Sequence, residues 1–226
     1  ALADLHQRNV VYRDLKMENI LMTNSGHIIL TDLGMSCLLP PGQRSISYVG
    51  TPQYMVVNWI LFIVAPEIIN RRGHDKDTDY WSLGVLAYQM MVGVVPFNGN
   101  SVEVGVRKDD IQTIFSRITR QAVIQPPMLS LNAAISLLHV GEGIPLGSML
   151  LVEPEDRLGH HGIEEIMSHP FFRGVDWDAV RCRSTPLPLT PAYTQMTSIA
   201  SGEISPKGVG ISELYDDQPS IFDRFS

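Results

Sequence analysis

The chain has 226 residues, enough for one domain with a substantial core and an appended tail. Hydrophobic residues make up 44% of the sequence and charged residues 18%, the balance of an ordinary soluble globular protein. The net charge of −7 argues against nucleic-acid binding as the main function and mildly favours basic partners.

The cysteine content and the hydropathy point to one cellular setting. Two cysteines, Cys37 and Cys182, form no disulfide framework, so we expect a reducing, cytoplasmic compartment. No apolar run approaches the roughly 18 residues that a membrane helix needs, and no signal peptide opens the sequence. The sequence therefore predicts a soluble intracellular protein without a membrane span.

Residues 1–9 carry Leu2 and Leu5 at helical spacing and are typical of the end of a helix. Because the chain starts inside this helix, we expect it to be truncated at its N-terminus.

Residues 10–22 hold a charged run between two apolar ends. Apolar ends anchor in a core, and such a scaffold presents polar side chains at fixed positions. Asp14 is followed by Lys16 and Asn19, a spacing that suits phosphoryl transfer. There a carboxylate accepts a hydroxyl proton, a lysine neutralises the migrating phosphoryl group and an asparagine holds a metal ion. The plain alternative is a polar surface turn.

Two short apolar segments, 20–22 and 28–30, flank a Gly-containing turn and predict a β-hairpin. Asp32-Leu33-Gly34 follows the second strand directly. An aspartate at a strand end is placed to bind Mg²⁺, and Gly34 permits the backbone turn that follows. On its own, such a tripeptide is more often a plain turn.

The run Tyr12-Arg13-Asp14-Leu15-Lys16-Met17-Glu18-Asn19 resembles the catalytic loop of eukaryotic protein kinases, and Asp32-Leu33-Gly34 resembles their D-F-G motif. Tyr12 in place of the first His of that loop is typical of the AGC group of serine/threonine kinases. The resemblance implies that Asp14 orients the substrate hydroxyl and accepts its proton, and that Lys16 stabilises the transferring group. It also implies that Asn19 and Asp32 hold the Mg²⁺ of bound ATP.

The resemblance gives Glu18 a role in substrate choice. It would contact an arginine upstream of the phosphoacceptor, which implies basic substrate sites. The alternative is a solvated acid on the loop, because one carboxylate is a thin basis for specificity.

Residues 36–49 are rich in Pro, Gly and Ser and predict a flexible loop. Gly50-Thr51-Pro52-Gln53-Tyr54-Met55 and Ala65-Pro66-Glu67 resemble the end of the AGC activation segment, where the family joins the two pieces directly. Here residues 56–64 stand between them.

The resemblance assigns two positions in this segment. Thr51 would buttress Asp14 and Lys16. Ser47 occupies the activation-loop phosphosite, where a phosphate would pair with Arg13 through charge-assisted hydrogen bonds. The alternative is that Ser47 is one of several loop hydroxyls and is never modified.

Residues 76–93 are apolar on every side, which predicts a buried helix with Gly93 as its stop. The segment resembles the central helix of the kinase large lobe, in which Asp79 would tie the helix to the backbone of the catalytic loop. As an ordinary first-turn acid, Asp79 would instead interact with the helix dipole.

Residues 111–118 show the spacing of an amphipathic helix, residues 131–139 predict another helix, and residues 162–172 resemble the closing helix of the kinase domain. By the same resemblance Arg157 pairs with Glu67, as a structural ion pair. No metal cluster is expected from the three nearby histidines, His160, His161 and His169.

From Trp177 the periodicity is lost and Pro, Ser, Thr and Gly dominate, which predicts a partly disordered tail. Residues 186–193 resemble the proline segment of the AGC C-terminal extension. Phe222-Asp223-Arg224-Phe225 resembles the F-D-x-[FY] tether of that group, so Phe222 is a candidate contact of the ATP adenine. The alternatives are an F-x-x-F motif that docks on the small lobe, or an arbitrary aromatic pair.

The resemblance covers only the large lobe and tail. The Gly-rich loop, the strand Lys and the helix Glu of a small lobe are missing, so the chain alone should bind nucleotide poorly. Two runs, 56–64 and 140–148, interrupt segments that the family joins. Both start with Val, whose codons begin with the GT of an intron donor. We therefore hypothesise a faulty gene model, with lineage-specific loops as the alternative.

We expect a mainly α fold, the large lobe of a protein kinase with a short β-hairpin at the active site and an extended tail. Residues 1–172 would form the kinase domain and 173–226 the AGC C-terminal extension. The expected function is transfer of the ATP γ-phosphoryl group to Ser or Thr hydroxyls near basic residues, after activation by an upstream kinase. The alternative is a non-catalytic kinase-like binding or regulatory module.

Overall fold

The computed structural model describes residues 1–23, 26–46, 64–92, 95–97, 108–120 and 146–184. The chain divides into two compact units, one of Ala1–Ile20 with Leu30–Trp177 and one of Leu21–Ile29 with Asp178–Ser226. None of the helices in the described ranges has the length and apolar character that a bilayer crossing requires.

Helices dominate the described residues. They are α1 (Leu2–Gln7), α2 (Pro66–Ile69), α3 (Asp77–Val92), α4 (Lys108–Thr119), α6 (Leu146–Met149), α7 (Ile163–Met167) and α8 (Trp177–Arg181), with 3₁₀ turns at Met17–Asn19, Pro154–Asp156 and Pro170–Phe172. The strands are short, namely β1 (Val10–Val11), β2 (Ile20–Met22), β3 (Ile28–Leu30) and β4 (Cys37–Leu38). This largely helical architecture with a small β component confirms the expected fold class.

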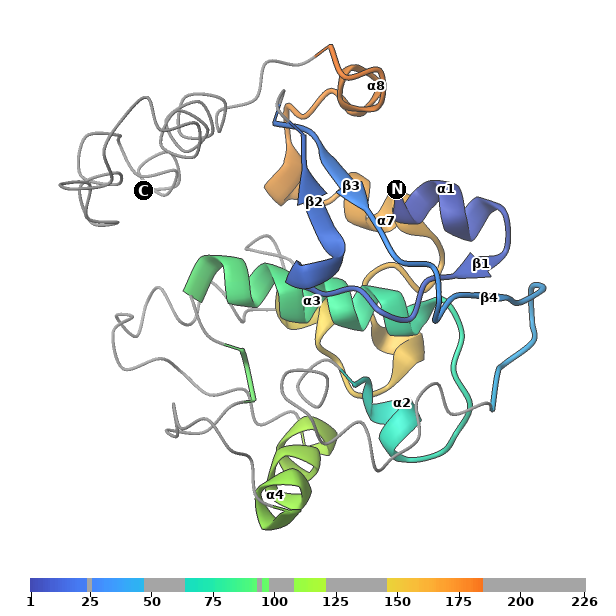
Figure 1. Cartoon of the computed structure of the whole chain (residues 1–226), viewed down its shortest axis with the longest axis vertical. Coiled ribbons are helices and arrows are strands. Elements are labelled where there is room, and N and C mark those ends of the chain that lie inside the picture. The colour runs from blue at the N-terminus through green and yellow to red at the C-terminus, as the bar shows by residue number, and fades with distance from the viewer. Residues whose placement is uncertain (24–25, 47–63, 93–94, 98–107, 121–145, 185–226) are drawn as a thin grey trace, which may run out of the picture. The chain divides into compact units, whose positions relative to one another are not determined.

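Helix α3 runs through the middle of the first unit, as Figure 1 shows. Its side chains enter three separate clusters of buried residues. In the first, Trp81 and Val85 pack with Ala65, Val95, Phe97, Ile114, Ile118 and Leu150. In the second, Leu86 packs with Leu2, Tyr12 and Leu15, and in the third Tyr80 packs with Met149 and Ile166. A helix that is packed from several sides gains from apolar residues on each of them. This packing explains the apolar sequence of 76–93.

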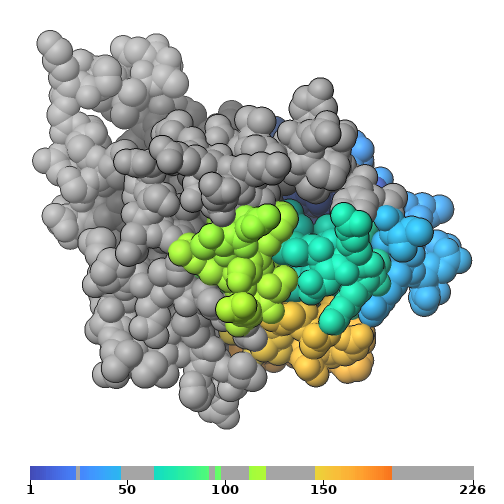
Figure 2. Space-filling model, turned by 90° about the horizontal axis from the view of Figure 1, so that it is seen from below, coloured from blue at the N-terminus to red at the C-terminus, as the bar shows by residue number. Residues whose placement is uncertain are grey.

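Helices α2 and α4 lie side by side at the surface of the same unit, as Figure 2 shows. The side chains of Ile114 and Ile118 are buried, so α4 turns its predicted apolar stripe toward the core.

The contact between α3 and α6 depends on a glycine. A Cβ atom on Gly84 would lie 2.8 Å from the Cβ of Met149, too close for any other residue without a shift. The neighbouring Leu146 is fully buried. The last residues of the run 140–148 are therefore part of the core, and residues 140–145 lie outside the described residues.

The strands form two small sheets. β1 and β4 are antiparallel, with Val10 opposite Leu38 and Val11 opposite Cys37. β2 and β3 form the other sheet, so the hairpin predicted for residues 20–30 is confirmed.

Four expectations need correction or lie beyond the described residues. The segment expected to be a loop from residue 36 contains β4, and the tail expected to lose periodicity at Trp177 begins with α8. A two-residue strand and a five-residue helix are too short to leave a periodic signal. The helix predicted for 131–139 and the stop at Gly93 fall outside the described residues.

Candidate active site

The backbone of the loop after β1 is fixed by Asp79, whose side chain is fully buried near the start of α3. The backbone N–H groups of Tyr12 and Arg13 donate to its two carboxylate oxygens, at 2.8 and 2.7 Å. His6 Nε2 lies 2.7 Å from Asp79 Oδ2 and links α1 to the same carboxylate. Hydrogen bonds to an ionised acceptor are the strong ones, so the helix determines where the residues after Arg13 stand.

Asp14, Lys16 and Asn19 come together in the loop, as their spacing predicts. Lys16 Nζ lies 2.9 and 2.8 Å from the two carboxylate oxygens of Asp14. Asn19 Nδ2 donates to Asp14 Oδ2 at 2.7 Å and to the Asp14 carbonyl at 2.8 Å. Asp14 and Asn19 are buried, whereas the Lys16 side chain keeps 18% of its surface exposed. The cluster is held by protein groups and still has access to solvent.

The Asp-Leu-Gly segment is attached to this cluster through Thr31. The Asn19 carbonyl accepts hydrogen bonds from Thr31 N at 2.9 Å and from Thr31 Oγ1 at 3.2 Å. The buried Tyr12 hydroxyl donates to the Thr31 carbonyl, and burial raises the pKa of this phenol, so it keeps its proton. Asp32, the next residue, is exposed and accepts from Gly34 N at 2.9 Å through Oδ1. Asn19 and Asp32 are therefore linked by a single residue.

The loop after β1 and the Asp-Leu-Gly segment each contain a residue other than glycine in the left-handed region of backbone conformation. The φ angles are 66° at Arg13 and 56° at Asp32. Such conformations cost about 1–3 kcal/mol each and persist only where the surroundings hold them, most often at functional sites.

Glu67 and Arg157 form a buried ion pair. Arg157 Nη1 and Nη2 each donate to one oxygen of Glu67 at 3.0 Å, and Thr78 Oγ1 donates to the same carboxylate at 3.1 Å. Arg157 also donates to the carbonyl oxygens of Leu151, Val152 and Asp77. The guanidinium is thus surrounded by acceptors and unavailable to a ligand.

Of the remaining predicted site residues, the structure describes Glu18 alone. Glu18 is exposed in the 3₁₀ turn Met17–Asn19. Thr51, Ser47 and Phe222 lie outside the described residues.

Three histidines around the site were not predicted to contribute to it. His6 reaches Asp79, His74 Nε2 lies 3.4 Å from Arg13 Nη1, and His160 Nδ1 lies 2.7 Å from Asp77 Oδ2. Each contact joins residues more than 60 positions apart. The sequence around a histidine carries no local pattern that reveals such a distant partner. Only the folded structure could therefore identify these three contacts.

The chain belongs to the protein kinase family, because the model of the protein kinase domain matches residues 1–172. It is 39% identical to ribosomal protein S6 kinase alpha-6 of Homo sapiens over 193 residues, 85% of this chain and 22% of that protein. It is 36% identical to the serine/threonine-protein kinase AtPK1/AtPK6 of Arabidopsis thaliana over 203 residues, 89% of this chain and 38% of that protein. These matches confirm the resemblance to AGC-type serine/threonine kinases.

The chain spans well under half the length of these relatives, 22% of the human protein and 38% of the plant protein.

Proposed function

We propose that the protein is a serine/threonine kinase that transfers the γ-phosphoryl group of ATP to protein hydroxyls. The observation that carries the proposal is the arrangement of Asp14, Lys16 and Asn19 within hydrogen-bonding distance of one another in a loop fixed by Asp79. Phosphoryl transfer depends on positioning and electrostatic stabilisation, and a preformed cluster supplies both.

Asp14 is the candidate base. Asn19 holds one of its oxygens and its carbonyl, which fixes the direction of the carboxylate. A substrate hydroxyl that binds beside Asp14 would be oriented by this carboxylate and give up its proton to it as the phosphoryl group arrives. Lys16, beside the same carboxylate, supplies positive charge where the phosphoryl oxygens carry negative charge.

Asn19 and Asp32 are the candidate residues for Mg²⁺. Amide and carboxylate oxygens are the ligands that this ion prefers, and it usually takes one or two carboxylates together with substrate phosphates. No group of three or more His, Cys, Asp or Glu side chains in the described part of the chain gathers into a metal site. Bound Mg²⁺ with ATP would supply charge neutralisation, and the link through Thr31 keeps the two protein ligands together.

The domain boundary and the regulatory positions belong to the same proposal. Residues 1–172 would form the kinase domain, which the range of the family match supports, and 173–226 the C-terminal extension with Phe222 near the adenine. A phosphate on Ser47, added by an upstream kinase, would pair with Arg13, and Thr51 would support Asp14.

Substrate choice and location complete the proposal. The exposed carboxylate of Glu18 supports a preference for basic residues near the phosphoacceptor. Cys37 and Cys182, both free thiols, support a cytoplasmic location.

The proposal is tested by transfer from radiolabelled Mg-ATP to a basic Ser/Thr peptide, with the full-length protein and its Asp14→Asn variant. The variant should lose roughly 10²- to 10⁴-fold in turnover, because its amide cannot accept the proton. Asp4→Asn makes the same chemical change at an exposed position in α1 and should keep wild-type turnover.

Equal turnover of Asp14→Asn and wild type would contradict the proposed role of Asp14. Binding of Mg-ATP without any transfer by the wild-type protein would favour the non-catalytic binding module instead.

A further inference from the structure

His74 is a buried histidine, 5% exposed, on the connection between α2 and α3. Its backbone forms an antiparallel bridge with Ser45. Ser45 N donates to the His74 carbonyl at 2.8 Å, and His74 N donates to the Ser45 carbonyl at 2.9 Å. The position of His74 is therefore tied to the segment that follows β4.

The side chain of His74 faces the catalytic loop. Its Nε2 lies 3.4 Å from Nη1 of Arg13, the residue directly before Asp14. The same guanidinium donates through Nε to the carbonyl of Met35 at 2.6 Å, directly after the Asp-Leu-Gly motif. The guanidinium thus joins the Asp-Leu-Gly segment to His74.

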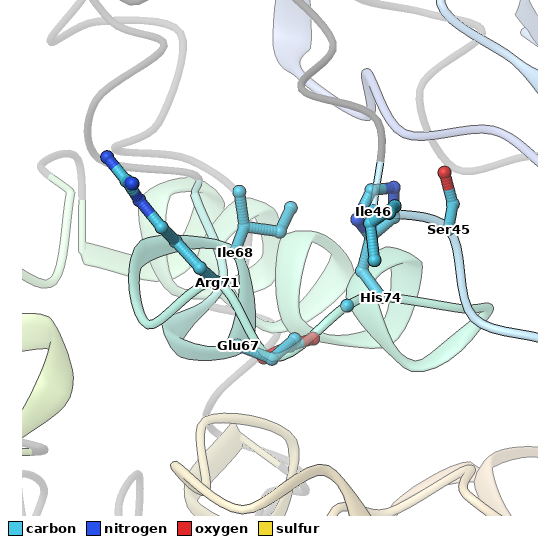
Figure 3. Close-up of a pocket in the computed structure, with 7 residues that line it drawn as sticks. Ser45, Ile46, Glu67, Ile68, Arg71 and His74 are labelled. Atoms are coloured by element: carbon cyan, nitrogen blue, oxygen red, sulfur yellow. The ribbon is translucent and has the colours of Figure 1, made fainter.

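The turn that brings His74 to Ser45 requires Gly73. Its φ is 77°, and a Cβ atom at this position would lie 3.2 Å from the Cβ of Arg44. Figure 3 shows His74 beside Ser45 and Ile46. These three residues line a pocket of about 290 Å³. The opposite side of the pocket carries Ile68.

The charged groups around the His74 imidazole shift its pKa in opposite directions. Burial lowers the pKa of His74, and the Arg13 guanidinium lowers it further, while the carboxylates of Glu67, Asp75 and Asp79 raise it. The pKa of His74 is lower than its usual value of 6.5, so the ring is neutral at pH 7. A neutral ring that faces an arginine with Nε2 presents a lone pair there, with its proton on Nδ1.

We propose that His74 is a positioning residue, whose neutral imidazole accepts from Arg13 and holds the guanidinium against the Met35 carbonyl, and that acidification releases this contact. Protonation places a second donor and a second positive charge opposite Arg13, so the contact is lost. The proposal rests on the proposed kinase function for its effect on turnover. The contact itself does not depend on that function.

The contact is tested by a pH titration of the full chain carrying ¹⁵N-labelled histidine, followed by NMR. The resonance of His74 is assigned by its loss in His74→Gln, with His161→Gln as the control at an exposed histidine. His74 should titrate below the usual range with the Nδ1–H tautomer, and Arg13→Met should raise its pKa by on the order of one unit. Arg8→Met, at an exposed arginine, should leave it unchanged.

A His74 that carries its proton on Nε2, or whose titration is unaffected by Arg13→Met, would overturn the proposal. This measurement decides the contact even if the protein transfers no phosphate.

The effect on turnover is tested with two replacements in the full-length protein. His74→Leu has no hydrogen-bond acceptor and should lower turnover at neutral pH by about tenfold or more, since misplacement of a neighbouring group by 1 Å can cost that much. His74→Gln presents an amide oxygen near the place of Nε2 and should restore turnover, without the decline at acidic pH that His74 causes in the wild type.

Equal turnover for both variants at every pH, or an unchanged acidic decline in His74→Gln, would contradict the positioning role. A common thermal unfolding midpoint for the two variants shows that a difference in turnover does not come from misfolding. Absence of turnover in the wild type would contradict the proposed kinase function, and the NMR titration would still test His74.

Discussion

Two carboxylate–cation pairs of the first unit use the same chemistry in different surroundings. Lys16 and Asp14 retain side-chain exposures of 18% and 9%, whereas Arg157 and Glu67 retain 0% and 2%. The Arg157 guanidinium has acceptors from a carboxylate and three backbone carbonyls. The Lys16 ammonium has the Asp14 carboxylate and open solvent.

The difference separates a structural pair from a reactive one. A buried pair with all its hydrogen bonds made is costly to break from one side, because the remaining charge stays buried. In the Asp14–Lys16 pair, the Lys16 side chain keeps access to solvent, so its charge is not sealed inside the protein. We conclude that Glu67–Arg157 fixes α2 to the segment after α6. The partial exposure of Lys16 is consistent with the proposed role of Asp14 and Lys16 in phosphoryl transfer.

Arg157→Met should produce the largest loss of stability, because it leaves Glu67 buried without its cation. We expect the free energy of unfolding to fall by roughly 3–5 kcal/mol in urea titrations. The double variant Glu67→Met/Arg157→Met should recover much of this loss, because neither charge then remains.

The matched control is Arg72→Met. Arg72 pairs with Glu153 at 2.9 Å, with side chains 56% and 50% exposed, so its loss should cost less than about 1 kcal/mol. Equal losses of unfolding free energy for Arg72→Met and Arg157→Met would contradict the distinction between buried and exposed ion pairs.

Asp79→Asn should have the next largest effect, because the amide has one acceptor oxygen where the carboxylate has two. One of the amides of Tyr12 and Arg13 would lose its partner, at a cost of roughly 2–3 kcal/mol. Hydrogen exchange should show reduced protection at these two amides. Asp156→Asn, at an exposed position, should alter neither quantity; unchanged protection in Asp79→Asn would show that Asp79 does not fix the loop.

The smallest expected effect is a dependence of the folding stability on pH that comes from the buried Asp77. Burial, with a contribution from Asp75, raises the pKa of Asp77 to about 6, against the lowering effects of His160 and Arg157. Its Oδ1 is buried and has no hydrogen-bond partner among the described residues. The folded state thus binds the proton more tightly than the unfolded state, whose pKa is near 3.8.

The stabilising contribution of protonated Asp77 is complete below about pH 4 and is lost as the pH rises through about 6. Urea titrations between these values should show a smaller slope of stability against pH in Asp77→Asn than in the wild type. Asp156→Asn should keep the wild-type slope, and the same slope in Asp77→Asn would refute the protonation of Asp77.

The sequence predicts the local parts of the site well. Asp14, Lys16 and Asn19 stand within six residues, so spacing alone places them together. The contacts of Asp79 with Tyr12 and of Arg157 with Glu67 span 67 and 90 residues, and only the family resemblance points to them. The contacts of His74 and His160 have neither a local pattern nor a family motif behind them, so they emerge only from the packing.

Strands and helices are likewise predictable only where they leave a local pattern in the sequence. α3 is long and apolar on all sides, and its burial is predictable from sequence. β4 and α8 are too short for periodicity to reveal them. Leu146 lies in the run 140–148, which interrupts a segment that the kinase family joins. It is nevertheless buried in the core, because packing depends on apolar volume and not on continuity with the family sequence.

We propose that Asp14, Lys16 and Asn19 serve phosphoryl transfer, whereas Glu67 and Arg157 stabilise the fold. This proposal is tested most directly by measuring the unfolding free energy and Mg-ATP-dependent phosphotransfer of Asp14→Asn and Arg157→Met in the same full-length protein. We expect Asp14→Asn to lose transfer while its stability stays within about 1 kcal/mol of wild type, because the Lys16 ammonium keeps access to solvent and the asparagine side chain retains an acceptor oxygen. An Asp14→Asn variant that unfolds as readily as Arg157→Met, or that still transfers phosphate, would contradict the account.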